Sequence, residues 1–306
     1  TGSPKMVKLS HENLLSNAKS ICAYLKITKN DSCITTLSPS YSYGLSIINT
    51  HLLKGGKIFI NQLNITNHNF WRLIISNKIS SISLVPDQLE ILAKYSFFNK
   101  NLNSIKYMTS AGGKLKENVI SFLKKYCEKK EILFYVMYGQ TEASPRISYY
   151  KLNKTNLRHN CIGKPIKKGK LMISGKNKIG EIVYSGPNIF LGYAEDYLDL
   201  KKKASIKKKL NTGDIGYKDQ NGYFYVVERK KRIAKISGLR ISLDHLEEIF
   251  RNKKIMINCY LVNDKIKIYI KNMKFKKNVK SYLMNKLHLN DNDFSFISKQ
   301  INVRKK

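Results

Sequence analysis

Strand-like and helix-like segments alternate through the first half of this chain, and this alternation limits the available folds more than any other feature. Short apolar runs lie at residues 57–60, 81–85, 105–108 and 132–137, and helical patterns separate them. A helix is also expected after Ser10, a good N-cap residue. Alternating strands and helices predict an α/β fold built on a parallel sheet.

The second half of the chain has a different sequence pattern. From about residue 161, short strand-like runs at 170–173, 180–185 and 222–227 are separated by Gly turns, which predicts a small β-subdomain. A helix capped by Ser242 and a hairpin turning at 263–264 follow, which predicts an α+β end to the chain.

One polar stretch follows a buried-strand run directly. Residues 137–145 read Met-Tyr-Gly-Gln-Thr-Glu-Ala-Ser-Pro, and ligands of open α/β sheets bind where strands end. Tyr138 can lie along a purine, Gly139 permits close backbone approach, Thr141 can donate to a phosphate, and Glu142 can hold Mg²⁺. The alternative is a strand-to-loop turn with ordinary surface polar residues.

The strong positive charge does not by itself define a partner. The chain has 306 residues, 42% of them hydrophobic, which is enough for two domains, and its formal charge is +35. Such a charge is typical of proteins that bind nucleic acid or an anionic membrane. However, Lys is favoured over Arg and is spread along the chain, with dense clusters at 201–203 and 207–209, and no recognition motif is evident. Nucleic acid is therefore the less favoured partner.

The cysteines indicate neither a disulfide framework nor a zinc site. There are five, an odd number, without a Cys-X-X-Cys pair or a matching His cluster. No apolar run approaches the roughly 20 residues needed for a membrane span, and the start lacks a signal-peptide core. We therefore expect no membrane span and a cytoplasmic location.

Tyr138-Gly139-Gln140-Thr141-Glu142 resembles the signature of the acyl-adenylate-forming, or AMP-binding, enzymes. This superfamily includes acyl-CoA synthetases, luciferases and nonribosomal adenylation domains. Segments 1–5, 211–214 and 228–240 also resemble family motifs and occur in the same order. The four matches together span nearly the whole chain.

The resemblance implies an acid–thiol ligase that works in two steps. A small carboxylic acid first reacts with ATP, in the presence of Mg²⁺, to give an acyl adenylate and pyrophosphate. A thiol then takes the acyl group, and this thiol belongs to CoA or to the phosphopantetheine of an acyl carrier protein. Chemistry of this kind depends mainly on positioning and charge neutralisation.

The resemblance also assigns the residues around the phosphates. Thr1 and Gly2 would belong to a phosphate-binding loop, with Lys5 as a point charge on the phosphates. Thr141 would hold phosphate oxygens, and Glu142 would be the metal ligand.

For the base, the resemblance implies two walls around the adenine. Tyr138, Gly139 and Gln140 would lie on one side. Gly112, Gly113 and Lys114 would lie on the other, in a turn whose two glycines let a flat ligand approach the backbone.

For the ribose and the hinge, the resemblance points to three residues. Asp214 and Arg229 would grip the ribose, and Lys231 would be the catalytic hinge residue. The expected domains are a large AMP-binding domain at 1–230, divided at residue 160 into an α/β lobe and the β-subdomain, and a mobile C-terminal domain at 231–306. Glu228 stands where the family usually has Gly.

An acyl pocket is expected beside the segment 37–53, which resembles a loop and helix of the family. Many relatives carry a His in this loop, whereas Ser40 and Tyr41 stand in that vicinity here. Tyr41, Tyr43 and Gly44 are the pocket candidates, and the alternative is that they are plain core residues.

The ends of the sequence raise two other possibilities. The chain opens inside the expected phosphate loop and lacks the family's terminal Gly-Lys motif, so it looks truncated, with an upstream part missing and an incomplete C-terminal domain. A catalytically impaired nucleotide-binding fragment is therefore one alternative to an active ligase. A basic nucleic-acid-binding protein is the other, less favoured one.

Overall fold

A computed structural model describes most of the chain and divides it into two compact units. The described residues are 6–94, 102–152, 160–175, 178–194, 197–201, 209–229, 233–236 and 239–297. The first unit is Thr1–Thr212 with Tyr217–Tyr225, and the second is Gly213–Gly216 with Val226–Lys306.

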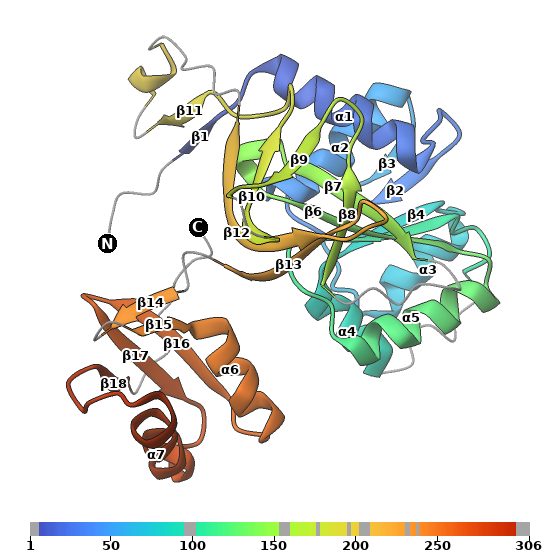
Figure 1. The fold of residues 1–306 in the computed structure, drawn as a ribbon. Helices are drawn as coiled ribbons and strands as arrows, with labels where there is room; N and C mark the ends of the chain where they lie inside the picture. Colours follow the sequence, from blue (N-terminus) through green and yellow to red (C-terminus); the bar gives the residue numbers. More distant parts are fainter. Residues whose placement is uncertain are drawn as a thin grey trace. The chain divides into compact units, whose positions relative to one another are not determined.

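The centre of the first unit is the parallel sheet that the sequence predicts (Figure 1). Its strands run in the order β3-β2-β4-β5-β6, and each is parallel to its neighbours. They are β2 (Ser32–Ile34), β3 (Lys57–Phe59), β4 (Ser81–Leu84), β5 (Tyr107–Ser110) and β6 (Leu133–Gly139). The strand expected at 105–108 begins later, because Ile105 still closes a turn by donating to the carbonyl of Leu102.

The strands expected to form a separate β-subdomain continue this sheet. After β6 the order is β7-β8-β13-β12-β10-β9, which gives a sheet of 11 strands. These strands are β7 (Arg146–Leu152), β8 (Cys161–Pro165), β9 (Lys170–Ile173), β10 (Ile179–Ser185), β12 (Leu210–Lys218) and β13 (Phe224–Arg229). A separate antiparallel pair joins β1 (Met6–Lys8) to β11 (Gly192–Ala194).

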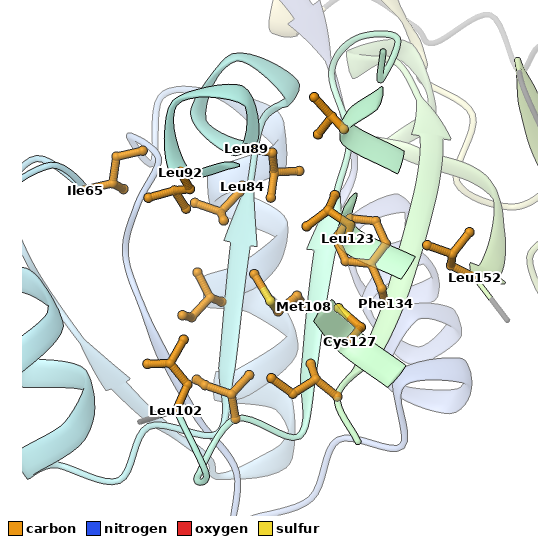
Figure 2. Packing of buried hydrophobic residues seen from close by; sticks show 14 of the residues in the cluster. Ile65, Leu84, Leu89, Leu92, Leu102, Met108, Leu123, Cys127, Phe134 and Leu152 are labelled. Atoms are coloured by element: carbon orange, nitrogen blue, oxygen red, sulfur yellow. The ribbon is translucent and has the colours of Figure 1, made fainter. Parts of the chain in front are cut away.

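Helices cover both faces of the parallel strands (Figure 1). On one face lie α1 (His11–Leu25) and α2 (Ser42–Lys54), and on the other α3 (His68–Ser76), α4 (Pro86–Lys94) and α5 (Glu117–Lys129). Successive side chains of a strand point to opposite faces of the sheet, where two separate hydrophobic cores lie. Tyr135 packs with α1 and α2, whereas Phe134 packs with α5 (Figure 2). None of the helices in the described ranges is long and apolar enough to cross a lipid bilayer.

Local sequence explains where α1 begins and where α2 ends. Before α1, the hydroxyl of Ser10 accepts from the N–H of Asn13 at 3.0 Å, and the Asn13 side chain accepts from the N–H of Ser10 at 3.0 Å. This reciprocal pair caps the helix as the sequence predicts. At the C-terminal end of α2, Gly55 adopts a left-handed φ of 67° and ends the helix.

The second unit contains the predicted α+β elements and has its own core. A hairpin of β14 (Ile233–Ile236) and β15 (Leu239–Ser242) precedes α6 (Leu243–Asn252). A three-stranded sheet then follows, made of β16 (Ile257–Val262), β17 (Lys265–Ile270) and β18 (Phe294–Ile297), with α7 (Lys276–Leu287) between its last two strands. Asn263 and Asp264 have φ of 49° and 56°, the left-handed pair of a tight hairpin turn.

These observations confirm the predicted fold class. The boundary expected after residue 230 stays a prediction, because residues 230–232 lie outside the described ranges. The described residues also include three short 3-10 turns, which are η2 (Thr141–Ala143), η3 (Leu198–Leu200) and η5 (Met273–Phe275).

The core under α5 gives a stability prediction. Leu123 is fully buried between α5 and the sheet (Figure 2), so Leu123→Ala should lower the free energy of unfolding by about 2–5 kcal/mol. Leu52→Ala is the control, because Leu52 is 65% exposed on α2. Urea denaturation measures both, and equal effects of the two substitutions would contradict the packing described.

Candidate functional site

The loop that follows β6 is closed tightly on itself. The N–H of Gln140 donates to the carbonyl of Pro145 at 2.9 Å. A Cβ on Gly139 would collide with that same carbonyl oxygen, so only glycine fits at this position. The hydrogen bond and the steric restriction together fix the path of residues 139–145.

The closed loop brings Thr141 to the start of α2. Its hydroxyl lies 3.1 Å from the hydroxyl of Ser42, the first residue of that helix. Thr141 is exposed. Two hydroxyls at a helix N-terminus, where backbone N–H groups and the helix dipole favour anions, form a suitable place for a phosphate.

Glu142 is held by a residue from β11. Its Oε1 accepts from the hydroxyl of Tyr193 at 2.8 Å, and its backbone carbonyl accepts from the N–H of Phe190 at 2.9 Å. Burial, followed by the hydrogen bond and charge of Glu142, raises the pKa of Tyr193 to about 12. Tyr193 is therefore a neutral donor at physiological pH, and it orients the Glu142 carboxylate.

This arrangement suits a metal ion that brings most of its own ligands. The described residues include no group of three His, Cys, Asp or Glu side chains able to hold a metal. Mg²⁺ in nucleotide sites is bound by one or two carboxylates together with phosphate oxygens and waters. The oriented carboxylate of Glu142, next to the hydroxyls of Thr141 and Ser42, fits that mode.

The predicted adenine wall lies at the end of the neighbouring strand. β5 and β6 pair in parallel up to Ser110 and Val136, so the turns that follow these strands leave the same edge of the sheet. Gly112, Gly113 and Lys114 are exposed in the turn after β5. Gly112 has a left-handed φ of 88°.

Two tyrosines of the predicted site differ in exposure. Tyr138 is half-buried. Tyr41 is 39% exposed, and its hydroxyl lies where a Cβ on Gly112 would be. Gly112 therefore makes room for the Tyr41 ring, which lies against this turn.

The other two pocket candidates lie in the interior. Tyr43 is 2% exposed, and its hydroxyl lies 2.7 Å from the hydroxyl of Thr109 at the end of β5. Burial raises the pKa of Tyr43 to about 12. Gly44 passes so close to the carbonyls of Leu37 and Ser38 that a Cβ would collide with them.

Some predicted site residues are not placed with this group. Thr1, Gly2, Lys5 and Lys231 lie outside the described ranges. Arg229 ends β13, but its side chain is not described. Asp214 is buried in β12 and belongs to the second unit. The roles assigned to all these residues stay predictions.

Three further residues of the site were not singled out from the sequence. Ser42 stands between two tyrosines that were considered as pocket residues, and Tyr193 follows a Gly in a segment already similar to the family. Arg146 follows the loop and is buried in contact with Tyr43.

Comparison with known protein families gives one match. The sequence profile of the AMP-binding enzyme family matches residues 1–194. The chain is 30% identical over 258 residues to the "Probable 4-coumarate–CoA ligase 3" of Dictyostelium discoideum, covering 81% of this chain and 47% of that protein. It is 28% identical over 252 residues to the 2-succinylbenzoate–CoA ligase of Listeria innocua, covering 81% of this chain and 51% of that protein.

The fold agrees with a solved structure of a similar kind. The O-succinylbenzoate CoA synthetase of Bacillus subtilis, in complex with ATP and magnesium ion, superposes with a TM-score of 0.73 at 20% identity. The alignment covers 98% of this chain and 64% of that one. The chain therefore spans about half the length of the curated relatives it matches and about two thirds of this structure.

The closed loop gives a prediction about its glycine. Gly139→Ala should lower the free energy of unfolding by about 1–3 kcal/mol or more, because the new methyl group overlaps a backbone carbonyl that cannot move without opening the loop. Gly113→Ala is the matched control, since its methyl group would meet only the Pro86 ring at 3.3 Å. If urea denaturation finds both variants equally stable, the loop is not closed as described.

Proposed function

The chain belongs to the AMP-binding enzyme family, and from this premise we propose that the protein activates a small carboxylic acid with ATP and passes the acyl group to a thiol. One observation carries the proposal. At the edge of the sheet where β5 and β6 end, an exposed glycine turn, a half-buried tyrosine, a hydroxyl pair and an oriented carboxylate lie on adjacent strands and loops.

The first step forms the acyl adenylate. A carboxylate oxygen of the substrate attacks the α-phosphorus of ATP, a new O–P bond forms, and pyrophosphate leaves. Thr141 and Ser42 donate to phosphate oxygens at the start of α2. Glu142, oriented by Tyr193, would hold Mg²⁺, and the ion would supply neutralisation of the phosphate charge.

The second step transfers the acyl group. A thiol of CoA or of a carrier-protein phosphopantetheine loses its proton, its sulfur attacks the activated carbonyl, and AMP leaves. Thr1, Gly2 and Lys5 are proposed to contact the phosphates during the first step. Lys231 is proposed as the hinge at which the C-terminal domain moves between the two steps.

The nucleotide itself is proposed to bind along the same edge. Tyr138, Gly139 and Gln140 line one side of the adenine, and the turn at Gly112, Gly113 and Lys114 lines the other. The exposed backbone of that turn supports this assignment.

The ribose is proposed to be held by Asp214 and Arg229. A carboxylate can accept from both ribose hydroxyls, and charge-assisted hydrogen bonds of this kind are stronger than neutral ones. We also propose a cytoplasmic location, which is supported by the five buried cysteines, because they form no disulfide.

The proposed activity is tested by pyrophosphate release from ATP with a panel of carboxylic acids, together with calorimetric titration of Mg²⁺–ATP. We expect Glu142→Gln to abolish pyrophosphate release and to weaken Mg²⁺–ATP binding at least about tenfold, because a metal-binding charge is lost. AMP binding without metal should stay unchanged.

The control for this experiment is Glu128→Gln, which removes a charge from an exposed position on α5. It should behave like the parent chain. If the Glu142→Gln protein binds Mg²⁺–ATP as tightly as the parent, the metal assignment is wrong; if the parent binds neither AMP nor ATP, the proposed function is wrong.

The ribose assignment gives a separate prediction. Asp214→Ala should weaken AMP binding by about 1.5–3 kcal/mol, the contribution expected of hydrogen bonds to a charged group. Because Asp214 is buried, thermal unfolding of the variant must first show that it is folded at the titration temperature. An unchanged AMP dissociation constant in the folded variant would exclude Asp214 from the site.

A further inference from the structure

Arg146, the first residue of β7, is a buried cation. It is 2% exposed. Its guanidinium lies 4.7 Å from the centre of the Tyr43 ring, and its Nη2 donates to the hydroxyl of Ser46 at 3.3 Å. Both contacts come from α2, the helix whose start meets Thr141.

This buried charge has no carboxylate partner within the described part of the chain. Its Nε is buried and makes no hydrogen bond there. The nearby tyrosines do not supply an anion, because burial raises the pKa of Tyr43 to about 12 and raises that of Tyr24 further. The buried carboxylate of Asp31 differs in this respect, because it lies 2.7 Å from the ammonium of the exposed Lys106.

A buried charge without a counter-ion is costly, and proteins normally pair it. A contact with an aromatic face offsets part of this cost. The hydrogen bond to Ser46 is long for an N–H···O contact. The Nε–Nη2 edge of a guanidinium is the edge that a carboxylate takes with two parallel hydrogen bonds, and here Nε is unpaired.

The neighbours of Arg146 connect it to the proposed acyl site. Tyr43, whose ring the guanidinium covers, bonds to Thr109 at the end of β5. Ser42, the residue before Tyr43, bonds to Thr141. Arg146 thus contacts α2 close to the end at which Ser42 and Thr141 are proposed to hold phosphate.

We infer that Arg146 is a specificity-determining residue that binds a second anionic group at the far end of the acyl substrate, so that the substrate is a dicarboxylic acid or a similarly charged acid. This inference rests on the proposed function, because it assigns the substrate class of the same site. A neutral acid would leave the buried guanidinium without its counter-ion.

The test uses two stable analogues of an acyl adenylate in which a sulfamate replaces the phosphate. They differ only at the far end of the acyl chain, which carries a carboxylate in one and the isosteric primary amide in the other. Several chain lengths are titrated into the parent chain by calorimetry. We expect the carboxylate analogue of at least one length to bind about ten- to a hundredfold more tightly than its amide partner.

Variants separate a binding role from a structural one. Arg146→Met should remove the preference while leaving the affinity for the amide analogue nearly unchanged, and Arg146→Lys should retain part of it. Arg72→Met is the matched control, because it makes the same substitution at an exposed position of α3 and should keep the preference. Circular dichroism and thermal unfolding establish that each variant is folded.

The outcomes are distinct. Equal binding of the two analogues to the parent at every length, or a preference that survives Arg146→Met, overturns the inference and leaves the proposed function standing. If Arg146→Met does not fold, the binding of the carboxylate and amide analogues to the parent chain still tests the inference. If neither analogue binds the folded parent, the proposed function fails and the inference fails with it.

Discussion

The candidate site depends on how tightly the chain closes after β6. Gly139 passes so near the carbonyl of Pro145 that no side chain fits, and the N–H of Gln140 donates to the same carbonyl. This closure determines where the next two residues point. Thr141 meets Ser42 of α2, and Glu142 meets Tyr193 of β11. A wider loop would separate the hydroxyl from the helix and the carboxylate from its orienting tyrosine.

The parallel sheet brings the second part of the site to this loop. Neighbouring parallel strands end at the same edge, so the glycine turn after β5 and the closed loop after β6 are adjacent without any special contact between them. The helices on the two faces hold these strands in place through separate cores. Loops positioned by such a packed scaffold are where binding residues are usually found.

Much of this arrangement could be predicted from local sequence. The alternation of strands and helices indicated the sheet, Ser10 indicated the start of α1, and Asn263-Asp264 indicated a hairpin turn, because each of these depends on a few consecutive residues. The stretch from Tyr138 to Glu142 lies within the residues that match the family, and its role in binding a ligand stays a prediction.

The remaining features depend on contacts between distant residues. Tyr193 and Glu142 are 51 positions apart, and Ser42 and Thr141 are 99 apart, so no local pattern links them. The strands expected as a β-subdomain proved to extend the same sheet, since strand pairing partners are not encoded locally. Arg146 was not singled out from the sequence, and only the fold shows that it is buried, without a carboxylate partner among the residues that the structure describes.

We expect the loop after β6 and the turn after β5 to bind an adenylate together. A crystal structure of this chain with bound AMP would show whether they do. The adenine should lie between Tyr138 and the turn at Gly112–Lys114, with the phosphate beside the hydroxyls of Thr141 and Ser42. Well-defined AMP bound elsewhere on the chain, with this edge of the sheet empty, would show that the nucleotide site is not here.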